Sequence, residues 1–244
     1  MFLSAGFFIT QAIARPDYVN QLLLPEQFIS MSSCLAKFLP DTWCIEWTND
    51  SYPERRRVAE FFDLTEVQLF ELIATVTPAF DGKFGWPNVI WELETARSFA
   101  ASFLHSSDMR ILELGLHHDF VETFCRDAEP EQHEGFAPVG RQGIHEAILK
   151  QRLTSALGIP LGFEPLLSDG MLSCSWLCNG LETVVAEQLH IQPNLAGLIA
   201  TIEEARLVAS FIARDDVGAE PGLWLPWLII DYTTDAEVGQ PSHR

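Results

Sequence analysis

Apolar residues recur every three or four positions along several parts of the chain, and this spacing predicts amphipathic helices. One such segment is residues 25–39, which precede a proline, and its apolar face would be formed by Phe28, Met31, Leu35 and Phe38. Pro53 can begin another helix, because a proline in the first helical position gives up no needed backbone donor. The same spacing predicts helices over residues 90–104, 117–128, 144–157, 181–189 and 198–213.

Thr65 and Gln68 predict the start of one further helix. A threonine followed three positions later by glutamine fits a capping box, in which the two side chains satisfy free amides at a helix start. Apolar residues then return at helical spacing and give this segment one buried face, formed by Leu69, Leu72, Ile73 and Val76.

Short apolar or alternating runs between turn residues predict the strands. They cover residues 43–47, 110–115 and 224–232, and a pair of strands is expected over 162–167 and 171–177 around Ser168-Asp169-Gly170. Helices and strands alternate without the regular rhythm of a nucleotide-binding fold. The pattern therefore predicts an α/β or α+β fold: a single domain with helices packed on a small mixed sheet.

The first residues are apolar and contain Ala12-Ile13-Ala14, which is similar to a signal-peptide cleavage site. No Lys or Arg precedes the apolar run, however, and a secretory signal needs a positive start. We therefore expect residues 1–30 to be an N-terminal apolar extension or helix, 31–232 the globular domain and 233–244 a C-terminal tail. On this view a chain that begins at Met31 folds and keeps its activity.

Charge changes the picture more than size does. The 244 residues include 34 Asp and Glu against 15 Lys and Arg, which gives a formal net charge of −19. Such a field repels nucleic acid and anionic membranes, and it attracts basic protein surfaces. Solubility alone is the other explanation of the acidity. No run approaches the roughly 18 apolar residues of a membrane span.

The cysteines do not form the pattern of a secreted disulfide framework, since their number is odd and they are widely spaced. Cys174 and Cys178 lie four residues apart, a spacing compatible with zinc, but no matching second pair of ligands follows. We expect both to be buried thiols without metal, in a reducing, cytoplasmic location. Elemental analysis of protein purified without chelator tests the absence of zinc.

No phosphate loop, dinucleotide fingerprint, nucleophile elbow or zincin pair is present, so the sequence predicts no enzyme, no catalytic residue and no cofactor. His117-His118-Asp119 is the most suggestive local cluster. On a helix, adjacent side chains diverge by about 100°, so the two histidines are not expected to face one metal ion. Glu92 and Glu94 are close in sequence, but nothing in the pattern places them across a cleft.

An acidic stretch is the strongest candidate for a binding surface, because concentrated like charge either faces solvent or serves a partner. Its candidate partner-binding residues are Glu122, Asp127, Glu129, Glu131 and Glu134. A turn at residues 49–52 adds Asp50 and Tyr52, since tyrosine is a favoured interface anchor. Charge reversal of the three glutamates at 129, 131 and 134 is expected to slow association.

Several segments together resemble bacterial immunity proteins of polymorphic and type VI secreted toxins. They are Trp86-Pro87-Asn88, Trp91-Glu92-Leu93-Glu94-Thr95-Ala96-Arg97, Leu112-Glu113-Leu114-Gly115-Leu116, Gly162-Phe163-Glu164, Ser175-Trp176-Leu177-Cys178-Asn179-Gly180-Leu181-Glu182 and Trp224-Leu225-Pro226-Trp227. The resemblance implies a protein that binds a cognate toxin and occludes the active site of that toxin. The acidity of the chain predicts a basic surface on the toxin. The alternatives are an enzyme of unrecognised type, or an adaptor or chaperone for a secreted effector.

Overall fold

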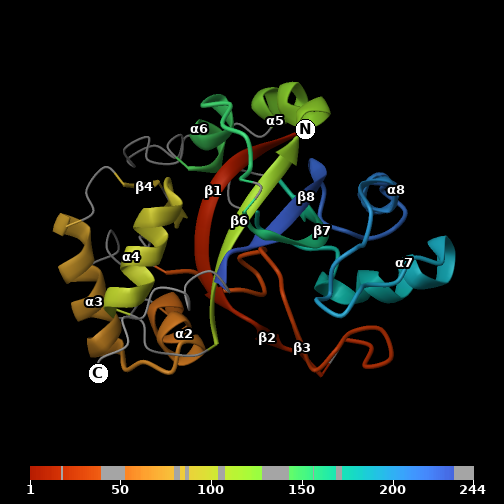
Figure 1. The fold of residues 1–244 in the computed structure, drawn as a ribbon. Coiled ribbons are helices and arrows are strands. Elements are labelled where there is room, and N and C mark those ends of the chain that lie inside the picture. Colours follow the sequence, from red (N-terminus) through yellow and green to blue (C-terminus); the bar gives the residue numbers. More distant parts are fainter. Residues whose placement is uncertain are drawn as a thin grey trace.

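The computed structural model describes residues 1–17, 19–39, 53–79, 83–85, 88–103, 108–127, 143–155, 157–168 and 172–233. These residues form one α+β domain around a six-stranded sheet (Figure 1). The strand order is β4-β5-β1-β6-β8-β7, and every pair of neighbouring strands is antiparallel. The expectation of a mixed sheet is therefore wrong. The predicted fold class, a single domain with helices packed on a small sheet, is confirmed.

The expectation that residues 1–30 are an extension or helix is wrong. β1 (Phe2–Gln11) lies inside the sheet, between β5 (Val89–Ile90) and β6 (Met109–His117), and all but its two end residues are buried. A strand covered on both faces is apolar at consecutive positions, and such a run cannot be told from a buried helix by periodicity. Gly6 adds a bulge: its φ is +98°, and a Cβ there would lie 2.4 Å from Val89 Cγ1.

The C-terminal half of the sheet is formed by β8 and β7. β8 (Trp224–Asp231) is fully buried, confirms the predicted strand, and pairs with β6 on one side and β7 (Ile159–Leu167) on the other. The strand expected over 162–167 is confirmed within β7, but residues 172–177 form no second strand: an isolated antiparallel bridge joins Leu166 to Ser175. The long apolar run of β8 completes the pairing of β7 in its place. β4 (Phe84–Gly85) ends the sheet at the other edge.

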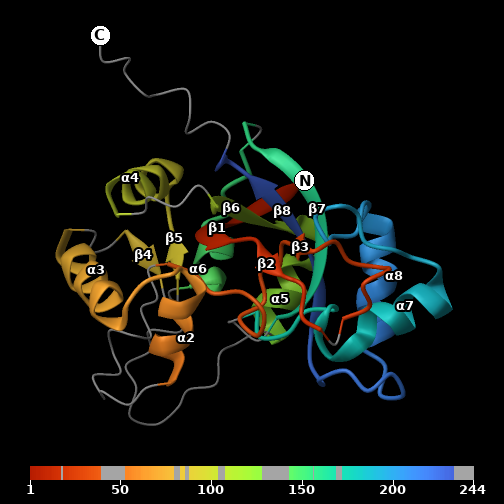
Figure 2. The ribbon, with the colours of Figure 1, turned by 90° about the horizontal axis from the view of Figure 1, so that it is seen from below.

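The helices surround the sheet in three groups (Figures 1 and 2). On one side lie α2 (Pro53–Phe61), α3 (Glu66–Ala79) and α4 (Leu93–Phe103). On the other side lie α7 (Leu181–Leu189) and α8 (Ile202–Ile212), of which α8 packs on β8 and β7. A third group, α5 (Val121–Asp127) and α6 (Ile144–Leu149), lies near the first residues of β1.

The capping box before α3 is confirmed. The amide of Gln68 donates to Thr65 Oγ1 at 3.2 Å, and the amide of Thr65 donates to Gln68 Oε1 at 2.8 Å.

The helix predicted over 144–157 is shorter in the structure, where α6 ends at Leu149. The chain then runs beside β1, where the amide of Thr154 donates to the carbonyl of Phe2 at 3.1 Å.

The helix predicted over residues 25–39 does not form. Residues 27–28 are strand β3 (Gln27–Phe28), which pairs with β2 (Ile13–Ala14), and the following residues are irregular. Glu164 of β7 holds this segment. It accepts hydrogen bonds from Ser30 Oγ at 2.5 Å and from the Met31 amide at 2.7 Å. A buried carboxylate that takes up these donors competes with the helical hydrogen bonds that the apolar spacing predicts.

Candidate functional site

The acidic surface predicted from the sequence is described only in part. Glu122 and Asp127 are exposed on α5, whereas Asp50, Tyr52, Glu129, Glu131 and Glu134 lie outside the described residues. Arg126 donates to Asp127 at 2.6 Å and 2.8 Å, and this hydrogen bonding lowers the pKa of Asp127 below its usual value. Part of the charge on α5 is therefore balanced within the helix, while the chain as a whole remains strongly acidic.

A strip of exposed apolar side chains follows the helix that packs against α5. The strip, which the sequence analysis did not single out, runs from the last residue of α6 to the first residue of β7 and comprises Leu149, Leu153, Leu157 and Ile159. Each of these side chains is more than half exposed; Leu157, at 72%, is the most exposed of the four. α5 and α6 are in contact, and His145 Nε2 lies 3.4 Å from the Cys125 carbonyl. Leu149, the first residue of the strip, thus ends a helix that contacts the acidic helix α5.

The histidine turn, by which we mean His117, His118 and Asp119, brings its three side chains together. His117 ends β6 and His118 begins a short 3-10 helix, so the expectation of diverging helical side chains is wrong. Their ring centroids are 4.4 Å apart. Asp119 lies 3.2 Å from His117 Nδ1 and 3.0 Å from His118 Nε2. Arg206 of α8 reaches the same carboxylate at 2.8 Å, and this hydrogen bond lowers the pKa of Asp119.

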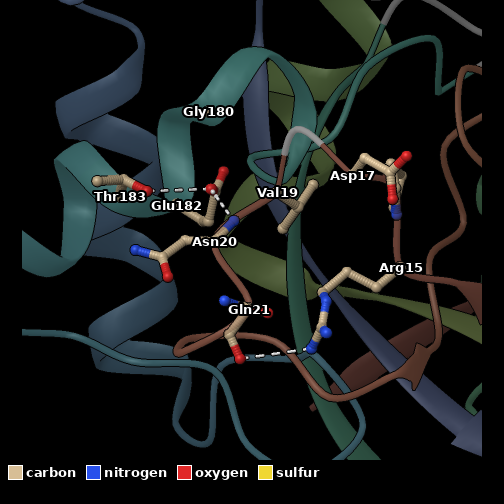
Figure 3. A pocket seen from close by; sticks show the side chains of 9 residues that line it. Arg15, Asp17, Val19, Asn20, Gln21, Gly180, Glu182 and Thr183 are labelled. Atoms are coloured by element: carbon tan, nitrogen blue, oxygen red, sulfur yellow. Dashed lines mark hydrogen bonds between the residues drawn. The ribbon is translucent and has the colours of Figure 1, made fainter.

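A polar cavity of about 480 Å³ lies between the segment after β2 and the start of α7 (Figure 3). Glu182 lines it, and this side chain is only 1% exposed. Its Oε1 accepts from the Asn20 amide at 3.4 Å and from Thr183 Oγ1 at 3.1 Å, whereas Oε2 has no protein partner. Arg15 lines the opposite part of the cavity and donates to the carbonyl of Gln21 at 3.4 Å. The cavity therefore offers one buried acceptor to water or to a small donor.

Two buried carboxylates of the sheet have structural partners. Glu164, besides Ser30 and Met31, accepts from Ser175 Oγ at 2.6 Å, and burial raises its pKa to about 7. Glu113 accepts from Tyr232 Oη at 2.6 Å, and burial raises its pKa as well. These acceptors fix neighbouring segments in place, because each carboxylate accepts hydrogen bonds from residues far away in the sequence.

The remaining carboxylate pair considered in the sequence, Glu92 and Glu94, is bound to arginines. Glu92 forms an ion pair with Arg152, and Glu94 pairs with Arg97 at 2.9 Å. Each carboxylate is therefore used at the start of α4 or beside it. A paired-carboxylate hydrolase needs two such groups facing each other across a substrate, about 5–10 Å apart.

The cysteines are only partly as expected. Cys178 is buried, but Cys174 is half-buried rather than fully buried. Cys34, which the sequence did not connect to them, lies beside Cys178, and its amide donates to the Ser173 carbonyl at 3.2 Å. A hydrogen bond from the Cys178 thiol lowers the pKa of Cys34 to about 6.

Cys34 is consequently expected to be the most reactive of the four described cysteines. At a pKa of about 6 an exposed Cys34 is mostly thiolate at pH 7.5, and the thiolate is the nucleophile. Limiting iodoacetamide followed by peptide mass spectrometry should label Cys34 before Cys125, whose pKa is raised by burial. The labelling rate of Cys34 should rise with a midpoint near pH 6 and shift upward in Cys178→Ala. A midpoint that Cys178→Ala leaves unchanged would refute the thiol contact.

The segments that carry the resemblance to immunity proteins lie mostly in the core. Trp176 and Trp227 are fully buried, as their size predicts, and Trp224 is buried at the start of β8. Trp91 is half-buried beneath Lys150, whose Nζ lies 3.8 Å from the ring centroid. These residues therefore stabilise the fold, and an interface would use other side chains.

No family model matches the chain, and comparison with curated proteins and with solved structures gives no match either. The resemblance to immunity proteins thus rests on the quoted segments and stays a prediction. Within the described residues, none of the helices is both long and apolar enough to cross a lipid bilayer.

Proposed function

We propose that this protein binds a basic protein in the cytoplasm, and that this partner is a secreted toxin domain whose active site it occludes. The observation that carries the proposal is the strip Leu149–Leu153–Leu157–Ile159, which is exposed and begins at the end of α6, the helix in contact with the acidic helix α5, on a chain of net charge −19. The resemblance of several segments to immunity proteins supports the choice of a toxin as partner.

Apolar and acidic groups would contribute to different steps of binding. Burial of exposed aliphatic side chains stabilises a complex by about 25 cal/mol per Å² removed from water. The four side chains of the strip can therefore hold a partner once it has docked. The acidic surface acts earlier, since complementary charge mainly raises the rate of encounter. A basic partner with an apolar patch fits both properties.

The enzyme and adaptor alternatives make different demands on the structure. An enzyme needs convergent polar groups in a cleft, and the Glu182 cavity is the nearest equivalent among the described residues. That cavity lies at the start of α7 (Figure 3), and Figure 1 shows α5 in another part of the molecule. Binding that depends on the strip and not on Glu182 supports an inhibitor.

The test uses a toxin domain whose gene lies next to the gene of this protein. Co-expression should restore growth of cells that make the toxin domain, and the purified proteins should form a complex. We expect Leu153→Ser/Leu157→Ser to raise the dissociation rate at least tenfold, because two apolar contacts are lost. Growth that is not restored, together with no complex, would reject the proposed function.

Charge on α5 is expected to act on the association rate. Glu122→Gln/Asp127→Asn should slow association several-fold at low salt, and the difference should shrink at high salt. The matched control is Glu187→Gln/Asp215→Asn, which removes the same two charges from exposed positions on and near α7 and α8. Equal slowing in both variants would mean that only the net charge matters and that α5 is not part of the interface.

A further inference from the structure

We propose that the histidine turn is a binding site for a divalent metal ion of the zinc class. Within the described part of the chain, no other group of three His, Cys, Asp or Glu side chains has its ligand atoms within 4.8 Å of one another. Two imidazoles and one carboxylate are typical zinc ligands, and three protein ligands leave a fourth position for water.

The spacing of the ligand atoms fits a small tetrahedral ion. Zinc–nitrogen and zinc–oxygen bonds of about 2.0–2.2 Å place neighbouring ligands of a tetrahedron roughly 3.3 Å apart. Asp119 Oδ2 lies 3.2 Å from His117 Nδ1, and Asp119 Oδ1 lies 3.0 Å from His118 Nε2. The ligand atoms of all three side chains lie within 4.8 Å of one another, so binding requires the two rings to close around the ion.

The contacts of the His118 ring orient it for a ligand role. Its Nδ1 lies 3.3 Å from the Met1 carbonyl, which only accepts, so Nδ1 carries a hydrogen and donates it. The other ring nitrogen, Nε2, faces an oxygen of Asp119 at 3.0 Å. A backbone carbonyl that fixes the second ring nitrogen is also the usual support of a metal-bound histidine.

His117 Nδ1 faces the same place. Arg206 Nη2 lies 3.1 Å from this nitrogen, and the terminal amino group of Met1 lies 3.4 Å from Nε2. A donor therefore lies beside each ring nitrogen. The ring is also packed edge-on against Phe2, with centroids 5.1 Å apart. His117 is therefore oriented by its neighbours before any ion arrives.

Arg206 is the internal competitor of the metal ion. Its Nη2 contacts both His117 Nδ1 and Asp119 Oδ2, so it supplies the positive charge that the metal would supply. Its guanidinium lies over the Phe120 ring, 5.0 Å from the centroid, and the side chain is 39% exposed. The arginine can thus rotate into solvent when a divalent ion binds. It does not serve the contact between His118 and Asp119.

The competing explanation is a second proton on His118. A doubly protonated ring would donate to Met1 on one side and to Asp119 on the other, and the 3.0 Å gap would need no metal. The two explanations differ in whether the protein binds zinc at this turn.

Isothermal titration of zinc chloride into the full-length protein, freed of metal by chelator and dialysis, tests the site. We expect one zinc ion per chain, and binding at least tenfold weaker in His118→Ala and in Asp119→Asn. His190→Asn is the matched control, since His190 ends α7 in a left-handed conformation that asparagine tolerates, and it should bind as the parent does. Cobalt in place of zinc should give the visible absorption of a tetrahedral site.

Arg206→Gln provides a readout that adventitious binding to surface histidines would not give. Removal of the competing cation should tighten zinc binding several-fold, with circular dichroism unchanged. No binding in both the parent and Arg206→Gln would overturn the proposal. Binding that survives in His118→Ala and Asp119→Asn would overturn it too, because the zinc would then be held elsewhere.

Discussion

A chain that begins at Met31 is expected not to fold. This truncation removes β1, β2 and β3, and with β1 it removes a strand that pairs with β6 over eight positions, from Phe2↔His117 to Gln11↔Met109. Circular dichroism during heating should show no cooperative transition, and gel filtration should show aggregates. The result would reverse the expectation drawn from the apolar spacing of the first residues.

The size of the effect follows from burial. Leu3, Phe7, Phe8 and Ile9 of β1 are each at most 7% exposed. Burial of one such side chain contributes about 1.5–3 kcal/mol, so their joint loss is comparable to the whole stability of a domain, about 5–15 kcal/mol. Leu22→Ser serves as the control within the same segment, since Leu22 is 88% exposed. A truncated chain that unfolds cooperatively would show that β1 is dispensable.

Glu164→Ala is expected to destabilise the protein by about 2–4 kcal/mol, because buried donors are left without an acceptor. Ser30 Oγ, Ser175 Oγ and the Met31 amide all donate to this carboxylate. The substitution therefore loosens the segment after β3 from β7. Urea unfolding of the parent and the variant gives the difference. Ser33→Ala, in the same segment but without a hydrogen bond to Glu164, is the control.

The same carboxylate gives stability a dependence on pH. The pKa of Glu164 is about 7 in the folded protein and about 4.5 when exposed. A raised pKa favours folding below pH 4.5, and this contribution falls as the pH rises through 7, by roughly 3 kcal/mol in total. Glu164→Gln should remove this fall while Glu113 keeps its own. An identical pH profile for the variant would show that Glu164 does not titrate in this range.

Local chemistry made parts of the fold predictable. The capping box at Thr65, the proline start of α2 and the aromatic run of β8 each have a cause within a few residues of sequence. The first strand had no such signal, because its pattern depends on which elements cover it. The helix expected over 25–39 failed for a similar reason, since Glu164, more than a hundred positions away, takes up its backbone and serine donors.

The candidate sites likewise include features that have a local cause in the sequence and features that depend on distant segments. Net charge and the acidic helix were readable from composition, and Glu122 and Asp127 are exposed as expected of a binding surface. The histidine turn could be found in sequence but not interpreted, because a change from strand to 3-10 helix between His117 and His118 decides whether they converge. Arg206 and Cys34 come from distant segments, and nothing local marks them.

The position of β1 has a consequence for synthesis on the ribosome. Its partner β6 is made about a hundred residues later, and β8, which completes that side of the sheet, later still. An apolar strand thus waits without β6 until nearly half of the chain has been made, and pairing of such distant segments is intrinsically slow. Nascent chains with an exposed apolar strand are prone to aggregate. Production of this protein should therefore gain more from slow, cool expression and chaperones than from any change to its surface.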